Sequence, residues 1–173
     1  SRYDHLVTYD GLPTIIKLDM LTREKNMPIH LHEFINELKQ KYTMELVHTY
    51  CKPRFYHEYA LSRLKSEGYM LGCASNSIKE SIEVMLLKSN LIKYMDVIYS
   101  AQDVLKPKPD PDIYIKAIST LGMTPEECLV IEDNENGIKA AKDSGAHVMV
   151  VKEVSEVNFI NIKQKIDQIN KKL

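Results

Sequence analysis

Four short apolar segments alternate with helical segments from Pro53 to the C-terminus, and this alternation constrains the fold more than any other feature. The segments read YMLGCAS, DVIYS, CLVIED and AHVMVV, and stretches with apolar residues at helical spacing separate them. Apolar strands that alternate with helices form a parallel sheet covered on both faces. We therefore predict an α/β fold in which helices flank a parallel sheet.

Residues 12 to 52 show helical spacing without strands. Apolar residues recur there at three- and four-residue steps on both sides of the sequence NMP, and Pro28 stands near the start of the second run. This pattern predicts a helical hairpin or a small bundle. We accordingly divide the chain into a helical subdomain, residues 1–52, and an α/β core, residues 53–173.

Composition excludes several classes of protein. The 173 residues are 44% hydrophobic, enough for one globular core, and the 23 basic and 24 acidic residues are interspersed. A net charge of −1 favours neither nucleic acid nor an anionic membrane as a partner. Cys51, Cys73 and Cys128 are odd in number and far apart, which indicates reduced thiols and a cytoplasmic location. No apolar run approaches the roughly 18 residues of a membrane span.

Polar side chains follow three of the predicted strands where each strand ends. Ser75 and Asn76 follow the first strand, the lysine and proline cluster KPKPD at 106–110 follows the second, and Glu132 and Asp133 close the third. Because parallel strands bring their carboxyl ends to one edge of the sheet, these groups should converge there. The set suits a metal-bound phosphoryl group, with carboxylates on Mg²⁺ and Lys and Ser on phosphate oxygens.

Each of these groups also has a purely structural interpretation. Ser75 and Asn76 could cap the next helix, the lysines could lie in a solvated loop, and Glu132 and Asp133 could begin a helix. The combination favours the site. An acidic pair closing an apolar strand is destabilised by desolvation and mutual repulsion unless a cation is present.

Other chemistries find little support in the sequence. The six histidines include no His-Glu-x-x-His pattern, and the chain contains no phosphate-binding loop, dinucleotide fingerprint or Gly-x-Ser-x-Gly elbow. A phospho-acceptor receiver domain also places acidic groups, Ser or Thr, and Lys at strand ends. In that class the acidic pair comes first, whereas here it comes last.

The segments MLGCASNS and KPKPDPDIYIKAISTLGMTPEECLVIEDNENGIKAAKDSGAHVMVV resemble the second to fourth motifs of the haloacid dehalogenase-like hydrolases, in the subgroup of β-phosphoglucomutase and phosphoglycolate phosphatase. The preceding helices resemble that subgroup's helical cap. The resemblance implies a Rossmann-like core and a Mg²⁺ cofactor. It also implies that Ser75, with Asn76 beside it, binds phosphate, that Lys108 stabilises the phosphoryl group, and that Asp133 with Glu132 holds the metal.

The family's first motif, a strand ending in Asp-x-Asp-Gly that carries the nucleophile, has one candidate here. The stretch HLVTYDGLPT has that shape, with Thr8 in place of the first Asp. Its apolar residues alternate with polar ones, unlike a central parallel strand. Pro13 starts a helix almost at once, and the roughly 40 residues that follow are few for a core helix plus a whole cap. We interpret the stretch as the start of the cap.

On this interpretation the first strand and its helix, roughly thirty residues, lie upstream of Ser1. In the family that strand is central, between the strands that end at Ser75 and Asp133. Without it, the sheet would have a gap one strand wide.

We therefore expect a Mg²⁺-dependent phosphatase that acts on a small phosphorylated metabolite through an aspartyl-phosphate, with the nucleophile strand outside this sequence. A sugar-phosphate mutase is the alternative in the same class. The subgroup's mutases carry an Arg where this chain has Pro13, Thr14 and Ile15, and its absence favours hydrolysis. A non-catalytic module that binds a phosphorylated ligand or a partner is a third hypothesis. The substrate and the oligomeric state stay open.

Overall fold

The computed structural model describes residue 9 and residues 11–171. Its helices are α2 (Thr14–Lys25), α3 (His32–Tyr50), α4 (Phe55–Ser66), α5 (Lys79–Lys88), α6 (Asp112–Thr120), α7 (Glu135–Asp143) and α8 (Phe159–Asn170). Its strands are β1 (Gly72–Ala74), β2 (Val97–Tyr99), β3 (Leu129–Glu132) and β4 (His147–Val150). Short 3₁₀ turns lie at Ile29–Leu31, Ile92–Tyr94, Ala101–Asp103, Pro125–Glu127 and Val154–Glu156.

All four predicted strands form, and their pairing is parallel as expected. Gly72 lies opposite Val97 in the β1–β2 pair, and Leu129 lies opposite His147 in the β3–β4 pair. A helix follows each of the four strands, which is the alternation that the sequence predicted. The α/β class is thereby confirmed.

Helices cover both faces of the strands. On one face, α6 and α7 contribute the buried residues Ile113, Tyr114, Ala140 and Ala141. On the other face, α4 and α8 contribute Ala60, Leu64 and Ile162. Full burial of an aliphatic side chain such as Ile113 contributes about 1.5–3 kcal/mol, so these two layers hold the strand ends in place.

The strands form two separate pairs rather than one continuous sheet. No described strand lies between β1 and β3. The space between the two pairs is a cavity of about 640 Å³, lined by residues of β1 and β3 and by apolar side chains of α4, α6 and α8. We call this cavity the slot. It lies where the sequence predicted the missing central strand, and a strand there would meet backbone groups on both sides.

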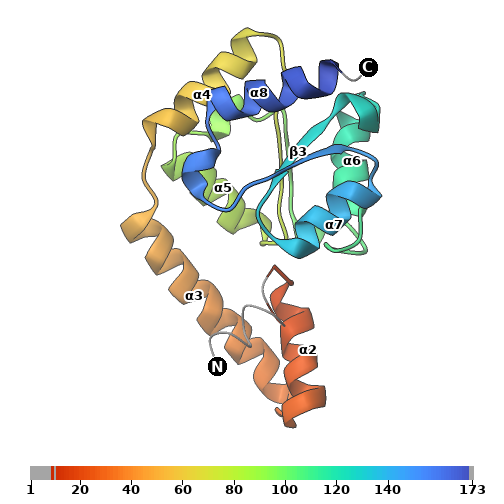
Figure 1. The fold of residues 1–173 in the computed structure, drawn as a ribbon. Helices are drawn as coiled ribbons and strands as arrows, with labels where there is room; N and C mark the ends of the chain where they lie inside the picture. Colours follow the sequence, from red (N-terminus) through yellow and green to blue (C-terminus); the bar gives the residue numbers. More distant parts are fainter. Residues whose placement is uncertain (1–8, 10, 172–173) are drawn as a thin grey trace.

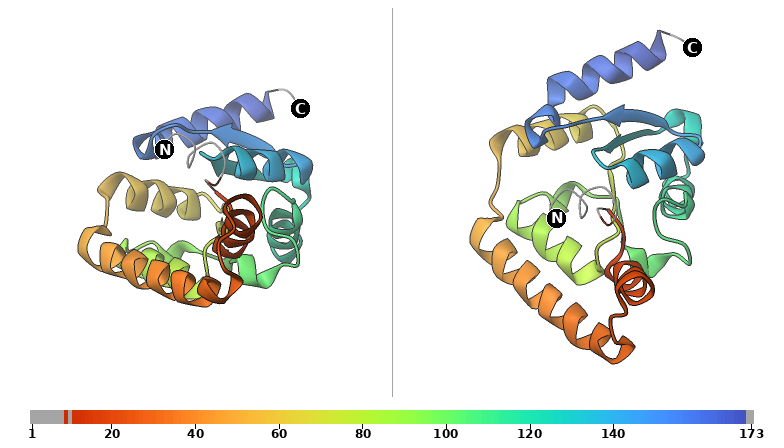
Figure 2. Two further views of the ribbon diagram at one scale, coloured as in Figure 1. Left: turned by 90° about the horizontal axis from the view of Figure 1, so that it is seen from below. Right: turned by 60° about the horizontal axis from the view of Figure 1, so that its bottom comes forward.

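Helices α2 and α3 form an antiparallel pair that projects from the α/β part on the side of α5 and α7 (Figure 1). Asn26 ends α2 in a left-handed conformation with φ of 54°, and Pro28 precedes the turn into α3, so the predicted helix break is confirmed. Figure 2 shows α3 running alongside α5, where Ser81 Oγ lies 3.5 Å from Gln40 Oε1. The division into a cap, residues 1–52, and a core, residues 53–173, stays a prediction.

One face of α3 carries large apolar side chains that the described part of the chain leaves uncovered. These residues recur every four positions, with exposed fractions from 37% to 73%: Phe34, Leu38, Tyr42, Leu46 and Tyr50. Val47 is the buried residue of this helix. The apolar spacing therefore predicted the helix correctly, but the side chains at this spacing stay exposed in the described part of the chain.

Two compositional predictions have a structural counterpart. Within residue 9 and residues 11–171, no helix is long and apolar enough to cross a membrane. Cys51, Cys73 and Cys128 are all unpaired, as their number and separation predicted.

Candidate active site

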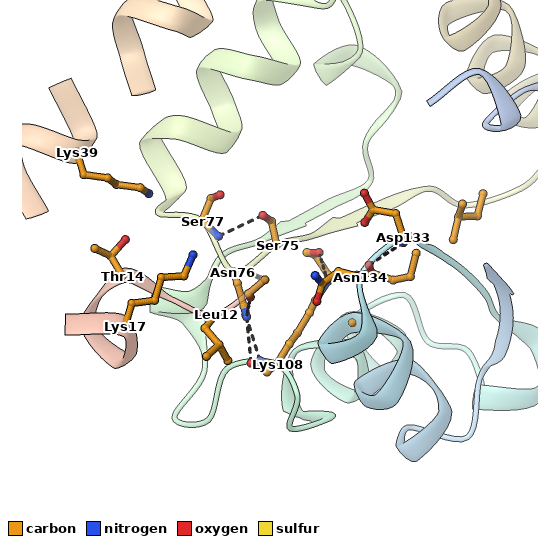
Figure 3. Close-up of a pocket in the computed structure, with 15 residues that line it drawn as sticks. Leu12, Thr14, Lys17, Lys39, Ser75, Asn76, Ser77, Lys108, Asp133 and Asn134 are labelled. Carbon is orange, nitrogen blue, oxygen red and sulfur yellow. Dashed lines mark hydrogen bonds and ion pairs between the residues drawn. The ribbon is translucent and has the colours of Figure 1, made fainter. Parts of the chain in front are cut away.

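A pocket of about 410 Å³ lies at the carboxyl ends of β1 and β3, between the core and the α2–α3 pair (Figure 3). The structure brings all the predicted site residues into its wall: Ser75, Asn76, Lys108, Glu132 and Asp133. Further residues complete the wall, among them Gly11, Thr14, Lys17, Lys39, Asn134 and Gly137. Groups from five separate segments of the chain therefore share one pocket.

Lys108 is a buried cation, with an exposed fraction of only 6%. Its ammonium group donates to the carbonyl of Ala74 at 2.9 Å, forms an ion pair with Glu132 and lies 4.6 Å from the ring centre of Tyr114. Lys106, two residues earlier, is 72% exposed and lies 3.8 Å from Asp110. The solvated-loop interpretation thus holds for Lys106 and is wrong for Lys108.

One carboxylate oxygen of Glu132, Oε1, accepts hydrogen bonds from both the Lys108 ammonium and the Tyr114 hydroxyl. Burial alone would raise the pKa of Glu132, but the charge of Lys108 and the hydrogen bonds from Lys108 and Tyr114 outweigh burial and lower it. Burial and the nearby Glu132 carboxylate both raise the pKa of Tyr114, which keeps its phenol protonated as a donor. Lys108, Glu132 and Tyr114 therefore form one charged, hydrogen-bonded unit.

Sequence reasoning missed Tyr114 and Gly137, which both support Glu132. A Cβ atom on Gly137 would lie 2.2 Å from the carboxyl carbon of Glu132, so only glycine leaves room for that carboxylate against α7. The available signals were a tyrosine in the first turn after KPKPDP and a glycine in the first turn after the acidic pair.

Ser75 lies at the end of β1, where its backbone N–H donates to the carbonyl of Tyr99 at 3.0 Å. Its side-chain oxygen accepts the backbone N–H of Ser77 at 3.2 Å. The N-cap of α5 is Ile78, which provides no side-chain cap, so the interpretation of Ser75 as a helix cap is wrong. The Ser75 hydroxyl proton has no acceptor in the described part of the chain and can serve a ligand in the pocket.

The Asn76 side chain connects the segment before α2 to the loop that carries Lys108. Its amide nitrogen donates to the carbonyls of Gly11, at 2.8 Å, and Lys108, at 3.0 Å, while its oxygen accepts the Lys108 backbone N–H at 3.1 Å. Both amide protons are therefore engaged. A phosphate-binding role for Asn76 stays a prediction, and its contacts indicate that it positions Gly11 and Lys108.

Gly11 lies close to Asn134 of the core. It has a φ of +73°, and a Cβ atom there would lie 2.1 Å from Oδ1 of Asn134. Positive φ and lack of space both require glycine at this position. Half of HLVTYDGLPT, residues 5–8 and Asp10, lies outside the described residues, but Pro13 does precede α2 directly.

The Asp133 side chain is the group that best fits a metal ion. Asn134 caps α7 by accepting the backbone N–H of Asn136 at 2.9 Å, so neither Glu132 nor Asp133 is the cap. Asp133 is exposed in the pocket wall. One oxygen of Glu132 is engaged by Lys108 and Tyr114, and the other accepts the Asp133 backbone N–H at 3.2 Å.

The described residues contain no cluster of three or more His, Cys, Asp or Glu side chains that could enclose a metal by itself. Magnesium, however, is usually held by one or two carboxylates, with waters and substrate phosphate filling the other positions. Asp133 fits such an ion together with a bound phosphate. The contacts of Glu132 suit the positioning of Lys108 better, and its role as a metal ligand stays a prediction.

The pocket wall holds a hydroxyl, a buried ammonium and an exposed carboxylate at the carboxyl edge of parallel strands, and these groups suit a phosphate and a hard cation. The family model described as "Haloacid dehalogenase-like hydrolase" matches residues 5–151. The chain belongs to this family, which confirms the resemblance seen in its motifs.

Two curated relatives align with this chain over part of their own length. A phosphoglycolate phosphatase from Aquifex aeolicus is 32% identical over 142 residues, which cover 82% of this chain and 64% of the relative. A pyrophosphatase, PpaX, from Bacillus cereus is 27% identical over 134 residues, which cover 70% and 61%. The chain therefore spans less than two thirds of either relative.

Solved structures share the fold. A β-phosphoglucomutase from Clostridium difficile has a TM-score of 0.76 at 23% identity, covering 91% of this chain and 78% of the other. A family IA hydrolase from Entamoeba histolytica has a TM-score of 0.77 at 23% identity, covering 98% and 84%. At this level of identity the likeness establishes the architecture alone.

Proposed function

We propose that this chain is part of a Mg²⁺-dependent phosphatase that acts on a small phosphorylated metabolite. The observation that carries the proposal is the convergence of Ser75, Lys108 and Asp133 on one pocket. A buried lysine tied to a carboxylate and a free hydroxyl are typical donors to a transferring phosphoryl group.

In this proposal each residue has one role. The Ser75 hydroxyl donates to a phosphoryl oxygen, and Lys108, held by Glu132 and by the carbonyl of Ala74, stabilises the negative charge that develops on that group. Asp133 would hold Mg²⁺, which supplies charge neutralisation at the phosphate. The α2–α3 pair, as the cap, would exclude water and contact the rest of the substrate.

The nucleophile, in our proposal, is an aspartate on a strand that occupies the slot. Such a strand would end at the pocket, because the slot extends along β1 and β3 to Ala74 and Glu132. The aspartate would attack the phosphorus as the ester P–O bond breaks and the alcohol leaves, and water would then hydrolyse the aspartyl-phosphate to free phosphate and the original carboxylate. On this basis the 173 residues alone should show no Mg²⁺-dependent hydrolysis of p-nitrophenyl phosphate, and turnover that Asp133→Asn abolishes would require a different nucleophile.

The names of the relatives support a small substrate. Phosphoglycolate and pyrophosphate, named in two of them, are both compact phosphorylated compounds. A mutase is the second candidate in the same class, and it is disfavoured because the subgroup's mutases carry an Arg where this chain has Pro13, Thr14 and Ile15. A cytoplasmic location also remains our proposal, supported by the three unpaired cysteines.

The test is phosphate release by the full-length protein from a panel of small phosphomonoesters, with and without Mg²⁺. We expect Mg²⁺-dependent release that Asp133→Asn reduces at least about 100-fold, an effect of the size seen when one charge-stabilising group is removed. With a hexose 1-phosphate, a mutase would give the 6-phosphate and a phosphatase would give free phosphate. Absence of both products across the panel would favour the non-catalytic module.

A further inference from the structure

Two lysines of the α2–α3 pair point into the same pocket from the side opposite the strands. Lys17 comes from α2 and Lys39 from α3, and both line the pocket with Ser75 and Lys108. Figure 3 shows both amino groups directed toward the segment from Ser75 to Ser77. The pocket therefore has a cationic wall on its cap side in addition to Lys108 on its core side.

These two charges lack an anionic partner within the described part of the chain. Lys65, Lys93, Lys106, Lys108, Lys139 and Lys163 form ion pairs there, whereas Lys17 and Lys39 do not. Among the described carboxylates of the pocket wall, Glu132 is paired with Lys108. Asp133 is the group proposed to hold the metal.

The two ammonium groups are also close enough to affect each other. Lys17 is half-buried, and Lys39, although more exposed, has its pKa lowered first by burial and then by the charge of Lys17. Like charges held close together disfavour each other unless an anion lies between them. A ligand with a negative group at this wall would remove that repulsion.

We propose that Lys17 and Lys39 bind a second anionic group of the substrate, a carboxylate or a phosphate, while Ser75 and Lys108 bind the phosphoryl group that is transferred. This inference rests on the proposed function. It identifies the substrate as a compact phosphate ester or anhydride with a negative charge at its other end, and it makes Lys17 and Lys39 specificity residues. A sugar monophosphate without a second charge would leave both lysines unpaired.

Calorimetric titration of the full-length protein in Mg²⁺ with phosphonate ligands that cannot be hydrolysed tests the inference. Phosphonoacetate carries a carboxylate at its other end, methylenediphosphonate carries a second phosphonate, and 2-hydroxyethylphosphonate is a neutral control of similar size. We expect at least one of the two doubly anionic ligands to bind about tenfold more tightly than the control, as for one good charge-assisted contact. The tighter of the two identifies the second group.

Variants locate the effect. Lys17→Gln and Lys39→Gln should each reduce this preference at least about threefold, and the double variant should abolish it, whereas all of them still bind 2-hydroxyethylphosphonate. Lys41→Gln is the control, because Lys41 is an exposed lysine on α3 like Lys39 but does not line the pocket, and it should leave the preference for doubly anionic ligands unchanged. Equal affinity for all three ligands, or a preference that survives in the double variant, would overturn the inference while the phosphoryl site stands. Failure to bind any of them would overturn the phosphoryl site as well.

Discussion

Replacing Glu132 by Gln should destabilise the protein far more than the loss of a surface ion pair. The substitution keeps the size of the side chain and an oxygen that can accept the hydrogen bond from Tyr114. It removes the charge that compensates the ammonium of Lys108. The side chains of Lys108 and Glu132 are only 8% and 11% exposed, so water cannot replace the lost carboxylate.

The magnitude follows from this burial. Removing one partner of a buried ion pair costs about 3–5 kcal/mol, because an uncompensated charge stays inside the protein. For a domain of this size, a loss of 1 kcal/mol lowers Tm by about 2–4 °C. The expected fall in Tm is therefore roughly 6–20 °C.

The assay is urea unfolding followed by far-ultraviolet circular dichroism, with Lys139→Met as the control. Lys139 pairs with Asp143 within α7, and both side chains are well exposed, so this substitution should cost less than about 0.5 kcal/mol. If Glu132→Gln and Lys139→Met destabilised the protein equally, the argument from burial would be refuted.

The same ion pair predicts a dependence of stability on pH. The pKa of Glu132 in the folded state lies below the ordinary pKa of a glutamate. The ionised carboxylate therefore stabilises the folded protein at pH values above that ordinary pKa. That contribution is lost as the pH falls through the ordinary pKa and toward the lowered pKa. The Gln variant should lack this component of the acid destabilisation.

Two further substitutions test the supporting residues. Gly137→Ala should displace the Glu132 carboxylate and lower the free energy of unfolding by roughly 1–3 kcal/mol through overpacking, although Ala favours a helix by about 1 kcal/mol. A higher free energy of unfolding in urea would show that the Glu132 side chain moves aside freely. Asn76→Asp removes the two amide N–H donors that bond to Gly11 and Lys108, which should lower the free energy of unfolding by about 1–3 kcal/mol. It should also accelerate amide hydrogen exchange at residues 11–17. Unchanged exchange there would mean that Asn76 does not hold Gly11.

The sequence was sufficient for the elements of the fold and for the main members of the site. Apolar strands, helical spacing and the order of the motifs predicted the parallel pairs and placed Ser75, Lys108 and Asp133 at one edge. These features are encoded over short stretches, so local patterns reveal them.

What the sequence did not reveal depends on contacts between distant segments. Whether Glu132 faces a metal or Lys108 depends on how α6 and α7 pack, and Tyr114 and Gly137 acquire their roles only through that packing. Lys17 and Lys39 resemble any other helix lysines until the α2–α3 pair is placed over the strands. A local pattern cannot distinguish a solvent-facing charge from one that faces a pocket.

The slot between β1 and β3 also bears on how the core opens and closes. The two strand pairs are joined by no backbone hydrogen bonds in the described structure. Regions without a shared hydrogen-bonded framework can unfold locally as separate units, each with its own free energy of opening. A strand seated in the slot would bond to both pairs and merge them into one cooperative unit. The segment proposed to carry the nucleophile would then also determine whether the two halves unfold together or apart.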